Sequence, residues 1–229
     1  DVLHRSTTGR WLVAITFDDG FRSVGTTAWP ILQELGIPAA VFVNKLAAER
    51  NFLPAMADYK IRTEEAWAAV AQQLGYRSPY EEAGATYQAH AGVDALLDHV
   101  DAFEQAGLLQ QRIYAPTQEL RGWHQQGLAL ASHSADHRLL AAHPPEAQHA
   151  SIMENKRWLE EALGVRSPHF ALPYGKPQHY NEATLAALRQ AGHRTVWRGD
   201  DGFAQPQPAH GLSTYPRLLA DGQSPPELG

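Results

Sequence analysis

The strongest constraint on the fold of this chain is the alternation of short apolar segments with amphipathic helical segments. The first of these apolar segments, 11–17, is rich in β-branched and aromatic residues, and all of them are too short for typical helices. The predicted strands are 11–17, 38–43, 128–132, 167–172 and 193–197. Strands that are apolar throughout are buried on both faces, and such strands separated by helices run parallel. The sequence therefore predicts an α/β fold, either a (β/α) barrel or an open doubly wound sheet.

Two of the predicted helices have clear boundaries in the sequence. The helix at 146–163 begins after two prolines and ends before Gly164. The helix at 182–191 has Asn181 as its N-cap and stops at Gly192. These signals fix where each helix begins and ends between two buried strands.

One long segment interrupts the alternation of strands and helices. Residues 45–118 contain two amphipathic patterns, at 67–74 and at 96–103, with no strand pattern between them. We interpret this segment as a helical insertion over one end of the β/α core. The organisation expected is one domain over residues 1–219, followed by a C-terminal tail at 220–229.

The composition limits the chemistry available to the chain. It has no cysteine, twelve histidines and a formal net charge of −6. Disulfides, thiol catalysis, iron–sulfur clusters and thiolate zinc sites are therefore excluded, and any metal must be bound by His, Asp or Glu. The scattered basic residues argue against nucleic acid, and no apolar run reaches the roughly 20 residues of a membrane span. Because the chain begins with Asp1 and not with Met, we expect a processed or trimmed product.

Polar clusters follow two of the predicted strands directly. Asp18, Asp19 and Gly20 follow the first strand, and His133 and His137 lie just beyond the strand at 128–132. Adjacent carboxylates repel each other unless a cation or proton is shared between them, and two histidines four residues apart can reach one metal ion. Alone, the acidic pair also suits a turn or helix cap, and the histidine pair a chance occurrence in a histidine-rich chain.

A third cluster, Pro173, Tyr174 and Gly175, follows the strand at 167–172. By itself it indicates a tight turn. Residues just beyond the carboxyl ends of parallel strands gather at one face of a β/α fold, where ligands bind. The three clusters are therefore expected to form one site.

These motifs resemble those of the NodB-type polysaccharide deacetylases of carbohydrate esterase family 4. The first motif reads TFDDG at 16–20, the second HSADH at 133–137, and the third, in part, FALPYG at 170–175. The resemblance covers about residues 11–217. It implies a distorted (β/α) barrel and a hydrolase that removes N-acetyl groups from an N-acetylglucosamine-containing polysaccharide or oligosaccharide.

The resemblance also implies roles for individual residues. Asp19, His133 and His137 would bind one divalent metal ion, with Zn²⁺ favoured and Co²⁺, Ni²⁺ or Fe²⁺ also compatible. Asp18 matches the general base, and the backbone N–H of Tyr174 matches the group that stabilises the oxyanion. The partner implied is an amino-sugar polymer or oligosaccharide. The family also implies export to the periplasm, envelope or exterior, with a cytoplasmic location left open and no oligomeric state indicated.

The chain departs from the family pattern at two places. The arginine that usually orients the base in the third motif is replaced by Ala171, as in a subset similar to poly-N-acetylglucosamine deacetylases. Arg198 and Arg217 both follow late strands and are candidates for this role, with Arg217 the better match. The last motif, which supplies the general acid, is not found, and His210 is a poor substitute.

The remaining candidate residues line or surround this site. Pro173 and Gly175 are expected to shape the loop that contacts the substrate, and Trp197 is a candidate platform for a sugar ring. His169 and His193 are placed at the opposite ends of their strands. The histidines expected to be solvated are His90, His99, His143, His149 and His179.

Two other functions remain open from the sequence alone. A small-molecule amidase or deformylase of NodB type is favoured if the 45–118 insertion narrows the mouth of the site. A family member that binds glycans without hydrolysing them is suggested by the loss of the usual arginine and of the last histidine. Both aspartates and both metal-site histidines are present, which favours the enzyme.

Overall fold

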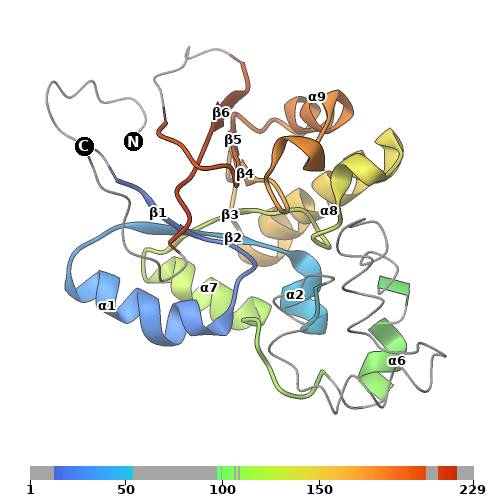
Figure 1. The fold of residues 1–229 in the computed structure, drawn as a ribbon. Coiled ribbons are helices and arrows are strands. Elements are labelled where there is room, and N and C mark those ends of the chain that lie inside the picture. The colour runs from blue at the N-terminus through green and yellow to red at the C-terminus, as the bar shows by residue number, and fades with distance from the viewer. Residues whose placement is uncertain are drawn as a thin grey trace, which may run out of the picture.

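The structure is a computed structural model that describes residues 13–53, 97–204 other than 99, 106 and 108, and 211–220. Six parallel strands form one curled sheet in which every strand pairs with the next one along the chain (Figure 1). The strands are β1 (Ile15–Phe17), β2 (Ala39–Val43), β3 (Ala129–Ser132), β4 (His169–Ala171), β5 (Thr195–Trp197) and β6 (Ser213–Tyr215). This order of parallel strands is that of an incomplete (β/α) barrel.

Helices lie between the strands along the chain, and most of them pack against the outer face of the sheet (Figure 1). They are α1 (Trp29–Glu34), α2 (Lys45–Arg50), α6 (Val100–Gln105), α7 (Thr117–Gln125), α8 (Pro145–Leu163) and α9 (Glu182–Gln190). Shorter helical turns are η2 (Val24–Ala28), η4 (Leu140–Ala142) and η5 (Pro177–His179). No helix in the described part of the chain is long and apolar enough to cross a membrane.

Both faces of the central strands are buried. On the outer face, Val41 and Leu130 pack against the helices in the largest core cluster. On the inner face, Phe42, Ala131 and Ala171 form a separate apolar cluster. Burial on both faces explains why these strands read as continuous apolar runs in the sequence.

The five strands predicted from the sequence are confirmed, with shorter bounds. Residues 11–12 of the first predicted strand lie outside the described residues. The ends of the helices are also confirmed: α8 stops at Gly164, which has a φ of 71°, and the Asn181 side chain accepts a hydrogen bond from the Thr184 N–H at the start of α9. The sixth strand, β6, is not among the five strands predicted from the sequence.

Helices α2 and α6 lie in the described part of the predicted insertion, whereas its residues 109–116 are not helical. α2 lies at its start, and α6 forms within the second predicted pattern, burying Val100 and Phe103. The helix expected over 67–74 lies outside the described residues, and the division into one domain and a tail remains a prediction. The end of the insertion returns to the core, where Tyr114 forms an antiparallel bridge with Phe21.

The helix that follows the acidic motif is packed closely against its neighbour. A β-carbon at Gly25 would lie 1.9 Å from a ring carbon of Trp123 in α7, so only glycine fits there. At the same place the helix widens into the π-helical turn η2. Such turns are rare and often lie beside functional sites.

We expect His193 to make the fold sensitive to acid. Its ring is 5 % exposed, and neither ring nitrogen has a hydrogen-bond partner. Burial, reinforced by the nearby Lys156 and His169, lowers its pKa to about 4. The unfolded chain takes up a proton near pH 6.5 while the folded one stays neutral, so stability falls as the pH drops from 6.5 toward 4.

The measurement is urea unfolding of the parent protein and of His193→Leu at pH 7 and pH 4.5. From the two pKa values, the parent should lose about 2–3 kcal/mol more than the variant over this range. Contributions from the other histidines cancel in the comparison. An equal loss in both proteins would contradict the assignment.

Candidate active site

Side chains from four strand ends meet at the carboxyl edge of the sheet. Asp18 and Asp19 follow β1, His133 follows β3, Tyr174 lies beyond β4, and Arg217 lies beyond β6. Because parallel strands end at the same edge, residues more than a hundred positions apart become neighbours. The sequence-predicted site residues are therefore brought together.

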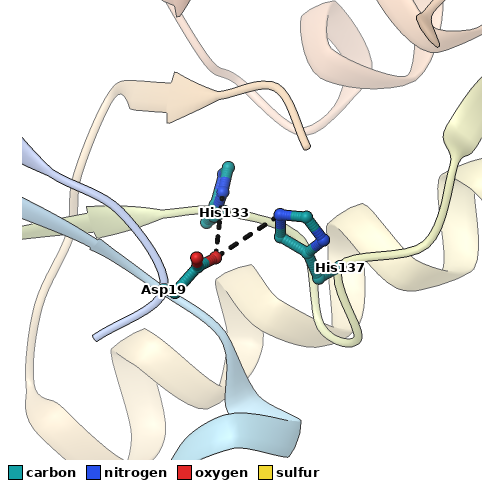
Figure 2. Close-up of side chains that lie close together, drawn as sticks. All are labelled: Asp19, His133 and His137. Atoms are coloured by element: carbon teal, nitrogen blue, oxygen red, sulfur yellow. Dashed lines mark ion pairs between the residues drawn. The ribbon is translucent and has the colours of Figure 1, made fainter. Parts of the chain in front are cut away.

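A compact group of possible metal ligands is formed by Asp19, His133 and His137 (Figure 2). The Oδ1 atom of Asp19 lies 3.5 Å from Nε2 of His133 and 3.4 Å from Nε2 of His137. All three ligand atoms lie within 4.8 Å of one another. Both imidazoles are buried, and the Asp19 side chain is 15 % exposed.

The group fits a divalent metal ion. Asp19 Oδ1 is buried without a hydrogen-bond partner, which is costly unless a cation satisfies it. Nδ1 of His133 lies 2.8 Å from the carbonyl oxygen of Ala171, an orientation that directs Nε2 toward Asp19. Metal-binding histidines are usually held in this way. One carboxylate and two imidazoles suit Zn²⁺ and leave coordination positions open.

The electrostatics of Asp19 and His137 favour the protonation states that a metal needs. Burial raises the pKa of Asp19, but the combined effect of His137, His133 and Arg217 is larger and opposite. The pKa of this carboxyl is therefore below its usual value. Burial lowers the pKa of His137 to about 4 despite the nearby carboxylates. Burial also lowers the pKa of His133, yet Asp18 and Asp19 outweigh this and raise it overall. An ionised Asp19 and a neutral His137 are ready to act as ligands.

The backbone is strained at each motif. Asp19, His137 and Tyr174 have φ values of 68°, 54° and 61°, in the left-handed region that side chains disfavour. Ser134, inside the second motif, has a φ of 64°. Among the described non-glycine residues the only other positive φ belongs to Asn51. Strain of this kind persists where the surroundings fix a functional side chain.

A buried amide holds the histidine loop in place. Nδ2 of Asn44 donates to the carbonyl oxygens of His133 and Ser134. The Ser134 hydroxyl in turn accepts the His137 N–H at 3.1 Å. The sequence analysis did not identify Asn44, although it follows the strand at 38–43 just as Asp18 follows β1.

Asp18 is held by an arginine from the other end of the chain. Nη1 and Nη2 of Arg217 each donate to one carboxylate oxygen of Asp18, both at 2.7 Å. This pair spans the gap between β1 and β6, the two edge strands of the incomplete barrel. Arg198, the other candidate, pairs with Asp200 at 3.1 Å.

Arg217 itself is fixed by three groups around it. Its guanidinium carbon lies 5.5 Å from the centre of the Phe42 ring, a cation–π arrangement. Nε donates to the Arg198 carbonyl at 3.1 Å, and Nη1 also lies 3.3 Å from Oγ1 of Thr16. The contacts of Phe42 and Thr16 with Arg217 were not predicted from the sequence, because they depend on how the sheet curls.

Comparison with known proteins identifies the family of this chain. The model of one protein family, polysaccharide deacetylase, matches residues 5–196. The chain belongs to the polysaccharide deacetylase family. The matched range includes all three motifs and stops before Arg217. No curated protein is significantly similar in sequence.

Solved deacetylases share the fold of this family member. A Streptococcus pyogenes deacetylase solved with acetate has a TM-score of 0.59 and 16 % identity, over 95 % of this chain and 68 % of that one. IcaB from Ammonifex degensii has a TM-score of 0.56 and 17 % identity, over 96 % and 73 %. The BpsB deacetylase domain from Bordetella bronchiseptica has a TM-score of 0.55 and 18 % identity, over 89 % and 69 %. The distorted (β/α) barrel expected from the sequence is confirmed.

The loop at Tyr174 packs against a histidine that the sequence analysis misjudged. His179 was expected to be solvated, but it is 4 % exposed. The turn η5 folds it back under the loop, where its ring lies 5.4 Å from that of Tyr174 and its Nδ1 accepts the Lys176 N–H. The Tyr174 ring also contacts that of His137, with centroids 4.8 Å apart. Pro173 and Gly175 are both buried beside it.

The remaining aromatic candidate lies on the inner face of the sheet. The Trp197 ring is 5.4 Å from that of Tyr215 and 6.2 Å from that of Phe42, and its indole N–H donates to Oγ1 of Thr195. Its contact with a sugar ring remains a prediction. His169, the first residue of β4, lies at the strand end opposite the site, as expected.

Proposed function

We propose that this protein is a metal-dependent hydrolase that removes N-acetyl groups from an N-acetylglucosamine-containing polysaccharide or oligosaccharide. One observation carries the proposal: the Asp19–His133–His137 group lies beside a second carboxylate, Asp18, that is held by Arg217. A binding module has no need of a base fixed next to a metal site. Membership of the polysaccharide deacetylase family supports the same chemistry.

Asp19, His133 and His137 would hold one divalent ion, with Zn²⁺ the best match to two imidazoles and a carboxylate. When bound, such an ion lowers the pKa of water and polarises a carbonyl group. Asp19 is committed to this role by its contacts with both histidines. The neighbouring carboxylate is therefore the one left to accept a proton.

Asp18 acts as the general base that takes the proton of the attacking water. Its Oδ2 atom lies 3.9 Å from Nε2 of His133, a distance that supports a base at the edge of the proposed metal site. Arg217 binds both oxygens of Asp18 and fixes the plane of the carboxylate. Arg217 thus takes the place of the arginine that Ala171 replaces in the third motif.

The loop at 173–175 stabilises the negative charge that forms on the acetyl oxygen. The backbone N–H of Tyr174 is the donor, and its left-handed conformation sets the direction of that N–H. Pro173 and Gly175 shape the turn. This donor requires no particular side chain at 174, and the ring packs against His137 and His179.

The substrate proposed is an amino-sugar polymer or its fragments, and the location proposed is outside the cytoplasm, where such polymers accumulate. The experiment is to measure acetate release from chitin oligomers, poly-β-1,6-N-acetylglucosamine oligomers, peptidoglycan fragments and a formamido sugar. Acetate from at least one of the glycans supports the proposal. Release of formate alone would favour the small-molecule deformylase, and no release from any substrate by the metal-loaded protein would contradict hydrolysis.

Arg217→Ala is expected to lower kcat about 100-fold without changing the amount of bound metal, because the base loses its orientation. Arg217→Lys should restore little, since lysine cannot bind both carboxylate oxygens in one plane. The matched control is Arg189→Ala, which breaks an exposed pair with Glu182 on α9. Full activity in Arg217→Ala would remove this arginine from the mechanism.

A further inference from the structure

Two loops that follow different strands touch each other at backbone level beside the site. Gly199, after β5, donates its N–H to the carbonyl oxygen of Gly175, after β4, at 3.0 Å. A β-carbon at Gly199 would lie 2.8 Å from the carbonyl oxygen of Tyr174, and one at Gly175 would lie 2.2 Å from the nitrogen of Gly199. No side chain fits between the loops.

The need for glycine at 199 comes from this approach and not from the backbone conformation. Gly175 has a φ of 69°, which itself favours glycine, whereas the φ of Gly199 lies outside the left-handed region. Gly199 is also exposed to solvent, so it contributes little to the core. What its missing side chain permits is contact with Tyr174 and Gly175.

The same loop reaches the second half of the site. The Arg198 carbonyl accepts a hydrogen bond from Nε of Arg217, and the backbone N–H of Arg217 lies 3.3 Å from the carbonyl oxygen of Asp200. Residues 198–200 therefore contact both the loop of Tyr174 and the arginine that holds Asp18. The segment 198–200 therefore links the position of the Tyr174 loop to that of Arg217.

We infer that Gly199 is a positioning residue that fixes the Tyr174 loop relative to Arg217 and Asp18. The inference rests on the proposed function, in which the Tyr174 N–H stabilises the oxyanion. Displacing this loop by a few tenths of an ångström weakens a contact made only in the transition state. Such a change lowers kcat and leaves substrate binding largely intact.

The test is steady-state acetate release by Gly199→Ala and Gly199→Val, with metal content measured in each. We expect kcat to fall about 10-fold in the alanine variant and further in the valine variant, with KM within about twofold and bound metal unchanged. The matched control is Gly122→Ala in α7, where a β-carbon meets nothing within 4 Å. A kcat within about twofold of the parent value in both Gly199 variants would overturn the inference.

A second measurement does not depend on the variants or on activity. In the parent protein, hydrogen exchange of the Gly199 amide should be slow, because it donates to Gly175. Exchange at the rate of a free loop would overturn the inference even if the variants fail to fold. If the parent protein releases no acetate from any glycan, the proposed function fails, and the exchange result still decides whether the contact exists.

Discussion

Replacing Asp18 with asparagine is expected to abolish acetate release while leaving the metal bound. The amide has nearly the same shape as the carboxylate but cannot accept a proton from water. Loss of a general base lowers rates by roughly 10²–10⁴-fold. Asp18 is not one of the three grouped ligands, so metal content should equal that of the parent protein. The measurement is kcat on the best glycan substrate, paired with metal analysis of the same preparation.

Two further variants sharpen the test of Asp18. Asp18→Glu keeps the carboxylate but moves it from its bidentate contact with Arg217, so activity should be low but measurable. Asp101→Asn changes an exposed carboxylate on α6 that pairs with Arg50, and its activity should match that of the parent. An Asp18→Asn protein that turns over at the native rate would show that another group is the base.

His133→Ala and His137→Ala are each expected to lose most of the bound metal and, with it, all measurable turnover. Each removes one of three protein ligands, and two remaining ligands rarely retain a divalent ion through purification. His133→Ala also removes the contact with the Ala171 carbonyl that orients the site. The measurement is metal content per chain, expected to drop from about one ion to near zero.

The control for these variants is His149→Ala, which changes a half-buried histidine on α8 outside the ligand group. Its metal content should equal that of the parent. Near-native metal content in both His133→Ala and His137→Ala would exclude the proposed ligand set, because a site made by other residues would not depend on them.

The sequence predicts those features that depend on local pattern or on strand ends. Asn181 and Gly164 mark helix boundaries because capping and left-handed termination involve only neighbouring residues. Asp19 and His137 could be paired in advance because both follow parallel strands, whose ends share one edge of the sheet. Neither inference needs the exact curvature of that sheet.

Features that depend on how loops and sheet faces approach each other could not be predicted. The stacking of Arg217 on Phe42 requires the sheet to curl until β6 faces β2. The burial of His179 depends on a short turn that folds back under Tyr174. The contact of Gly199 with Gly175 joins two loops with no shared motif. In each case the role of the residue depends on a contact with a segment that is distant in the sequence.

The residues of the site with left-handed backbone conformation could be predicted only in part. Asp19 and Tyr174 each precede a glycine, and both members of each pair have positive φ. The glycines are visible in the sequence as turn signals, but the strain on their neighbours is not. Holding Asp19 in this conformation directs its carboxylate to the two histidines, which is a tertiary requirement.

The most direct test of the central claim is acetate release from an N-acetylglucosamine oligomer by metal-loaded, chelator-treated and metal-restored protein. We predict release by the loaded protein, loss of at least 100-fold after chelation, and recovery when one equivalent of Zn²⁺ or Co²⁺ is added. Release that persists unchanged in protein shown to be free of metal would contradict the account.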